Sequence, residues 1–124
     1  MNDSLKRTLQ NIKEGKKQTC WFDIDGTIAD TDIKNYSIAE PDESITILIN
    51  KLYDNGNTII IFTARGATSG KDWRSVTENQ LKKWGVKYHQ LIMGYPKDLV
   101  VDDVAITPED FICEVEFNDE EKVG

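Results

Sequence analysis

The chain turns from apolar to acidic in the stretch CWFDIDGT, residues 20–27. Its first three residues are typical of the end of a buried strand, and Gly26 and Thr27 then break that strand. If the strand continued, Asp23 and Asp25 would point to the same side, because they are two residues apart. Two neighbouring carboxylates in a desolvated cleft require a compensating cation or proton. We therefore interpret this stretch as a strand end that opens into a metal-assisted phosphoryl or acyl-phosphate site.

Size and composition fit one globular domain. The chain has 124 residues, of which 39% are hydrophobic and 30% charged, so we expect residues 1–124 to fold as a single domain around one core. Membrane insertion is not expected, since no apolar run approaches the roughly 18 residues of a membrane span. The start of the chain also lacks an apolar secretory segment. Cys20 and Cys113 lie in apolar runs, which predicts buried thiols and a cytoplasmic, reducing setting.

The net charge of −7 is unevenly distributed. Residues 1–18 carry five basic and two acidic side chains, a balance of +3, so the remainder of the chain carries −10. This acidity argues against general nucleic-acid binding and suits a cation-dependent site. We expect 1–18 to form a basic helix or extension with a solvated face, an anionic partner being the less favoured reading. We expect the acidic residues 118–124 to form a flexible tail.

Hydrophobic periodicity predicts alternating helices and strands. A first helix capped by Asp3 or Ser4 is expected to end near residue 15, and further helices are expected over 41–54, over 71–84 and from 107. Strands are expected over 19–24, 58–63, 90–93 and 99–101. The stretch 26–41 reads as a loop or a short flap, and 111–117 fits either helix or edge strand. The alternation predicts an α/β fold with an open, doubly wound, Rossmann-like parallel sheet.

Polar side chains end three of the expected strands. Asp23 and Asp25 end the first, Thr63 ends the second, and Asp102 and Asp103 end the last. Ligands of such sheets bind outside the carboxyl ends of the strands. We therefore expect these five side chains to converge on one rim.

In this order and context, the motifs resemble those of the haloacid dehalogenase-like (HAD) superfamily of hydrolases. DIDGT at 23–27 is similar to the first motif of that family, Thr63 after IIIF to the second, and VVDD at 100–103 to the fourth. The resemblance covers about residues 18–110. The gaps between the motifs are too short to hold another domain, which implies the capless phosphatase type. Capless relatives close the site with a bulky substrate or with a neighbouring subunit of a homo-oligomer, and both readings stay open.

The resemblance implies a Mg²⁺-dependent phosphatase that works through an aspartyl phosphate. Asp23 would be the nucleophile, and Asp25 the general acid and then the general base. Dehalogenases of the superfamily lack an aspartate at the position of Asp25, which favours phosphoryl transfer. Mg²⁺ would be held by Asp23, by Asp25 through its backbone carbonyl and by Asp102, with Asp103 in support.

The same resemblance implies a set of phosphate-binding groups. The Thr63 hydroxyl, which also counts among the catalytic groups, and the Ala64 N–H would bind phosphoryl oxygens. Gly26 and Thr27 complete the phosphate-binding loop. Arg65 would bind the phosphate or a second anionic group of the substrate, and a solvated arginine is an equally favoured reading.

One position departs from the family pattern. Many members carry a lysine directly before a proline, and the closest capless relatives are expected to read Gly-Lys-Pro, but this chain reads GYPK at 94–97. Tyrosine supplies no positive charge, so the cationic role falls to Lys97, Arg65, Lys71 or Arg74. We favour Lys97, because a long side chain can reach the site from a nearby loop.

The expected substrate is a small or larger phosphate ester, either a sugar phosphate or a nucleotide or polynucleotide 3′-phosphate. The alternative is a catalytically weakened, Mg²⁺-binding regulatory or interaction protein of the same fold. A phosphate-accepting receiver domain is disfavoured, because its acceptor aspartate ends a middle strand, where this chain has Thr63. His89 is interpreted as a structural residue, and Trp73 and Trp84 are interpreted as core residues.

Overall fold

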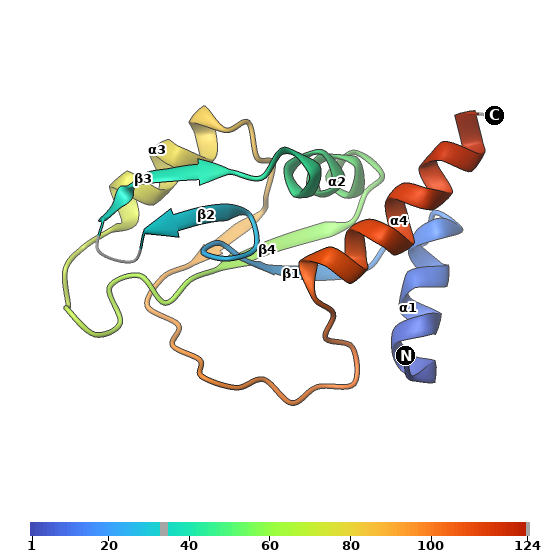
Figure 1. The fold of residues 1–124 in the computed structure, drawn as a ribbon, viewed down its shortest axis with the longest axis horizontal. Coiled ribbons are helices and arrows are strands. Elements are labelled where there is room, and N and C mark those ends of the chain that lie inside the picture. Colours follow the sequence, from blue (N-terminus) through green and yellow to red (C-terminus); the bar gives the residue numbers. More distant parts are fainter. Residues whose placement is uncertain (33–34, 124) are drawn as a thin grey trace.

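Helices and strands alternate along the chain (Figure 1). The computed structural model describes residues 1–32 and 35–123, and the side chains of 1–31 and 35–115. The elements are α1 (Asp3–Lys13), β1 (Thr19–Asp23), β2 (Ala29–Asp32), β3 (Asn35–Pro41), α2 (Glu43–Asp54), β4 (Thr58–Phe62), α3 (Arg74–Lys83), β5 (Gln90–Ile92) and α4 (Pro108–Val123).

The described strands form two sheets. The larger sheet is parallel with the order β1-β4-β5, and its register pairs Trp21 with Ile60 and Ile61 with Leu91. The β-branched, apolar run at 58–62 therefore forms the middle strand, as predicted. β2 and β3 pair in antiparallel fashion; we call this pair the flap. Parallel strands joined by helices make an α/β, Rossmann-like fold.

The core lies on one face of the parallel sheet. Phe22, Ile59, Ile61 and Leu91 are buried there, and successive residues of a strand point to opposite faces. α2 packs on β4, and Phe111 of α4 meets Phe22 edge-on with the ring centroids 5.9 Å apart. Each such side chain contributes about 1.5–3 kcal/mol when it leaves water.

The opposite face of the sheet is less covered. Trp21 is 52% exposed, and its ring centroid lies 6.1 Å from that of Phe62. In Figure 1, α2, α3 and the flap lie above the parallel sheet, whereas the segment 93–107 loops below it.

Side-chain caps determine where the first two helices begin. Asn2 Oδ1 accepts the N–H of Leu5 at 2.8 Å, so Asn2 is the capping residue of α1. The sequence predicts the cap one or two residues later, at Asp3 or Ser4. Asp42 caps α2 by accepting the N–H of Ser44 at 3.0 Å. α4 contacts both α1 and α2, and these contacts join the basic first helix to the core.

The structure differs from three sequence predictions and resolves one alternative that the sequence left open. The strand over 99–101 is not formed, because these residues are exposed and β structure depends on packing against neighbours. α3 begins at Arg74, three residues after the predicted start. Residues 111–117, left open between strand and helix, lie in α4. The α4 backbone continues to Val123, where a loose tail is predicted, and residue 124 lies outside the described part.

Across the described residues, no helix combines the length and apolar character needed to cross a bilayer.

Candidate active site

A tight turn after β1 carries the two acidic side chains. The carbonyl of Ile24 accepts the N–H groups of residues 27–29 at 3.1, 2.9 and 3.0 Å, and Ile24 itself is fully buried. Gly26 has a φ of +85°, a conformation that glycine adopts without strain. The Gly26 N–H donates to Ala29 O at 2.9 Å. The backbone N–H groups of Gly26 and Thr27 are thus used inside the turn, not offered to a phosphate as expected.

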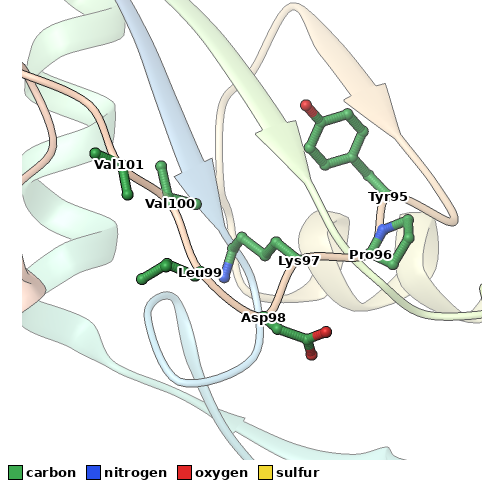
Figure 2. Close-up of a pocket in the computed structure, with 7 residues that line it drawn as sticks. All are labelled: Tyr95, Pro96, Lys97, Asp98, Leu99, Val100 and Val101. Carbon is green, nitrogen blue, oxygen red and sulfur yellow. The ribbon is translucent and has the colours of Figure 1, made fainter.

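Lys97 contacts the predicted nucleophile directly. Its Nζ lies 2.8 Å from Asp23 Oδ2, with the two side chains 33% and 21% exposed. Asp23 Oδ1 accepts the N–H of Ile24 at 2.8 Å. Figure 2 shows the Lys97 side chain directed toward the carboxyl end of β1. Both oxygens of Asp23 are therefore oriented, and a cation lies against one of them.

The loop after β5 is anchored to the end of β4, which explains how Lys97 reaches the site. The Tyr95 N–H donates to Thr63 O at 2.8 Å, and the Gly94 N–H donates to Arg65 O at 3.2 Å. The Tyr95 ring also packs edge-on against Phe62, with the centroids 5.8 Å apart. Lys97 follows two residues after this anchor.

Asp25 is held by a buried arginine. Arg65 Nη2 donates to Asp25 Oδ1 at 2.8 Å and Arg65 Nε donates to Oδ2 at 3.1 Å, a bidentate arrangement of the strong, charge-assisted kind. The Thr31 hydroxyl donates to Oδ1 at 2.6 Å. The Arg65 side chain is fully buried, whereas that of Asp25 is 22% exposed. The prediction that Arg65 binds substrate is corrected: its guanidinium faces Asp25 and the interior.

Two residues of α3 complete the surroundings of Arg65. Its Nη1 donates to Thr77 Oγ1 at 3.1 Å and to Gln80 Oε1 at 2.6 Å. Neither residue was singled out from the sequence. A signal was present, because Thr77 and Gln80 are polar residues on the same helix face as the buried Leu81, and buried polar side chains need partners.

The remaining predicted phosphate ligands lie at the end of β4. Thr63 is fully buried, and its Oγ1 accepts the N–H of Arg65 at 3.2 Å. Ala64 follows and is exposed at the rim. Lys71 and Arg74, the other candidate cations, are engaged elsewhere: Lys71 Nζ lies 4.6 Å from the centre of the Trp73 ring, and Arg74 pairs with Glu78 at 3.0 Å.

The predicted magnesium ligands are not brought together. Asp102 and Asp103 are exposed, and Asp102 Oδ1 accepts the N–H of Val104 at 2.9 Å. Within the described residues, no group of three or more His, Cys, Asp or Glu side chains is arranged to hold a metal ion. The cause lies in the missing strand over 99–101, which would have carried the Asp pair to the sheet rim. The expected ligands are the backbone carbonyl of Asp25 and one or two carboxylates, which is fewer than three side chains, so Mg²⁺ binding stays a prediction.

An open pocket adjoins Lys97. It has a volume of about 650 Å³ and is lined by residues 95–101 (Figure 2). Its wall includes the exposed side chains of Tyr95, Leu99 and Val101. A substrate group next to the Lys97–Asp23 pair would meet a largely apolar wall.

Other singled-out residues have structural contacts. His89 Nδ1 accepts the N–H of Ile59 at 3.0 Å, which extends the sheet ladder, as expected of a structural residue. Trp84 packs against the core. Trp73, predicted for the core, instead meets Tyr36 of the flap edge-on at 5.1 Å.

The two cysteines differ in their surroundings. Burial raises the pKa of the Cys20 thiol to about 11, because the thiolate is poorly solvated there. Cys113 is exposed, which corrects the expectation that both thiols are buried.

Comparison with solved structures finds the same fold elsewhere. A structural-genomics target from Vibrio cholerae aligns with a TM-score of 0.70 and 23% identity over 86% of this chain and 99% of its own. Chains from structures described as the Pnkp1/Rnl/Hen1 complex and the Pnkp1/Rnl/Hen1 RNA repair complex align with TM-scores of 0.51 and 0.52. Their identities are 23% and 20%, over 80% and 85% of this chain. The alignment spans only 34% and 32% of those two chains. At these identities the likeness concerns the fold. No protein-family model and no curated protein sequence matches the chain.

Proposed function

We propose that the chain is a phosphatase that hydrolyses a phosphomonoester through Asp23, on an HAD-like, doubly wound core without a cap domain. The observation that carries the proposal is the 2.8 Å contact between Lys97 Nζ and Asp23 Oδ2. An anionic nucleophile that attacks an anionic phosphate needs a cation at the point of attack. Lys97 supplies one in spite of the altered GYPK motif.

The reaction then has two steps. A carboxylate oxygen of Asp23 forms a bond to phosphorus, the bond from phosphorus to the leaving oxygen breaks, and Asp25 gives its proton to that oxygen. Water next attacks the phosphorus of the aspartyl phosphate, Asp25 takes a proton from this water, and phosphate leaves with Asp23 regenerated. The Lys97 ammonium offsets the negative charge on the phosphoryl oxygens in both steps.

Magnesium dependence remains a prediction from the family resemblance. No group of three or more His, Cys, Asp or Glu side chains that could hold a metal is found among the described residues, and neither step is routed through a metal. Assays with added Mg²⁺ and with EDTA test this prediction separately from the role of Asp23.

The pocket volume and the negative net charge favour a substrate of small size. The volume of about 650 Å³ beside Lys97 suits the organic part of a sugar phosphate or of a nucleotide 3′-phosphate. A net charge of −7 weakens binding of a long polyanion. Terminal 3′-phosphates of polynucleotides are kept among the substrates to be tested. The reason is that two structures with the same fold are Pnkp1/Rnl/Hen1 complexes, one of them described as an RNA repair complex. A neighbouring subunit as lid also stays a prediction.

The decisive test compares wild type with Asp23→Asn on p-nitrophenyl phosphate and on a panel of sugar and nucleotide phosphates. Asp23→Asn keeps the size of the side chain, so the fold is expected to persist while turnover is lost. Asp54→Asn, at a 58% exposed side chain that pairs with Lys87 on the surface, is the matched control and should keep wild-type turnover. Equal rates for wild type and Asp23→Asn would refute the proposal.

A second candidate is a catalytically weakened regulatory or interaction protein. It is favoured by Tyr95, which stands where the closest capless relatives are expected to carry a lysine. The half-exposed aromatic side chains of Trp21 and Tyr95 also offer a surface to a partner. If wild type binds Mg²⁺ but hydrolyses no phosphate of the panel, this reading replaces the phosphatase.

A further inference from the structure

The flap reaches Asp25 along two routes. On the direct route, the Thr31 hydroxyl on β2 donates to Asp25 Oδ1 at 2.6 Å. The indirect route runs through Gln80: its Nε2 donates to the carbonyl of Tyr36 on β3 at 2.6 Å, while its Oε1 accepts from Arg65 Nη1 at 2.6 Å. Arg65 in turn holds both oxygens of Asp25.

Aromatic contacts reinforce the indirect route. The Arg65 guanidinium carbon lies 4.8 Å from the centre of the Tyr36 ring, within the range of a cation–π contact. On its other side, Tyr36 meets Trp73 edge-on. Gln80 is 9% exposed and Arg65 is 1% exposed, so water competes little for these bonds.

We propose that the flap is part of the acid/base site, and that Thr31 and Gln80 are positioning residues which orient Asp25 for proton transfer. This inference rests on the proposed phosphatase function. Among the described contacts, Asp25 Oδ1 receives two donors and Oδ2 receives one. Each carboxylate oxygen has about two acceptor positions, so Oδ2 keeps the free position. The structure therefore assigns the exchanged proton to Asp25 Oδ2.

Leaving-group dependence separates positioning from general damage. When the leaving group is a good one, such as p-nitrophenolate, departure needs little help from an acid. Phenol, whose pKa is near the value of about 10 for the tyrosine side chain, leaves well only when it is protonated as the bond breaks. A misdirected Asp25 thus slows phenyl phosphate hydrolysis more than p-nitrophenyl phosphate hydrolysis.

The experiment measures kcat/KM for both esters with wild type, Thr31→Val and Gln80→Leu, using the full chain. Thr31→Val removes one hydroxyl at nearly constant size. Gln80→Leu removes both links of the indirect route. The controls are Ser37→Ala, a flap residue whose hydroxyl bonds to Asn35 within the flap, and Glu78→Gln on the exposed side of α3.

For each test variant we expect phenyl phosphate to lose at least about tenfold more in kcat/KM than p-nitrophenyl phosphate, a part of the 10²–10⁴-fold that general acid catalysis typically supplies. Both controls should keep the wild-type ratio. Equal losses on the two esters, or no loss, would overturn the positioning role and leave the phosphatase intact. Wild type that hydrolyses neither ester overturns the proposed function itself. Thr31→Val decides the question if Gln80→Leu fails to fold.

Discussion

Replacing Arg65 by methionine should destabilise the protein far more than replacing the exposed Lys87 by methionine. Arg65→Met deletes four hydrogen bonds, two to Asp25 and one each to Thr77 and Gln80. It leaves a partly buried carboxylate without its cation, a change that typically costs about 3–5 kcal/mol of stability. Since the Asp25 side chain is 22% exposed, water recovers part of this loss. The lower end, about 3 kcal/mol, is therefore expected.

Urea unfolding followed by circular dichroism measures this difference. With a slope of about 2 kcal/mol per molar urea, a loss of about 3 kcal/mol lowers the unfolding midpoint by about 1.5 M. Lys87→Met is the control, because Lys87 and Asp54 are 49% and 58% exposed and such pairs contribute at most about 1 kcal/mol. Equal midpoints for the two variants would refute the reasoning that the buried Arg65 stabilises the fold through its bonds to Asp25, Thr77 and Gln80.

Three further outcomes follow from the described contacts. Lys97→Ala should lower kcat/KM by about 10²-fold or more, as for loss of a donor to a developing charge, with little change in the unfolding midpoint. Wild-type turnover in this variant would show that another group supplies the positive charge at Asp23. At pH 8 with Ellman's reagent, exposed Cys113 should react quickly and Cys20 only on unfolding, because burial raises the Cys20 pKa to about 11 and the thiolate is the reactive form. His89→Phe keeps a ring beside Tyr53 but leaves the backbone N–H of Ile59 in β4 without its acceptor. Urea unfolding should therefore show a free energy of unfolding lower by about 1–3 kcal/mol, and an unchanged midpoint would contradict this.

Local sequence patterns predict the elements whose signals are local. The β-branched run of β4 and the helix expected over 41–54, which is α2, depend on neighbouring residues, and both elements were predicted. The strand over 99–101 was predicted but does not form, because three apolar residues form a strand only when a sheet edge and a packed face receive them. Leu99 and Val101 are instead 80% and 89% exposed.

In the candidate site, too, residues with a local sequence signal were predicted, and contacts between distant parts of the chain were not. Asp23 and Asp25 are found from their own spacing and their strand context. The partner of Asp25 is not, since Arg65 lies 40 residues further along the chain and no local pattern reports such a contact. Lys97 was favoured as the cation, but its contact with Asp23 depends on the bond between Tyr95 N–H and Thr63 O, which the altered motif alone does not reveal.

The edge-on contact between Trp73 and Tyr36 makes the flap optically visible. The chain has three tryptophans, and the other two report on different places: Trp84 packs against the core, and Trp21 is half exposed on the sheet. A chain with phenylalanine at those two positions keeps Trp73 as its only indole. Any displacement of the flap then changes the polarity around that fluorophore, and its emission follows flap position during substrate binding without an added label.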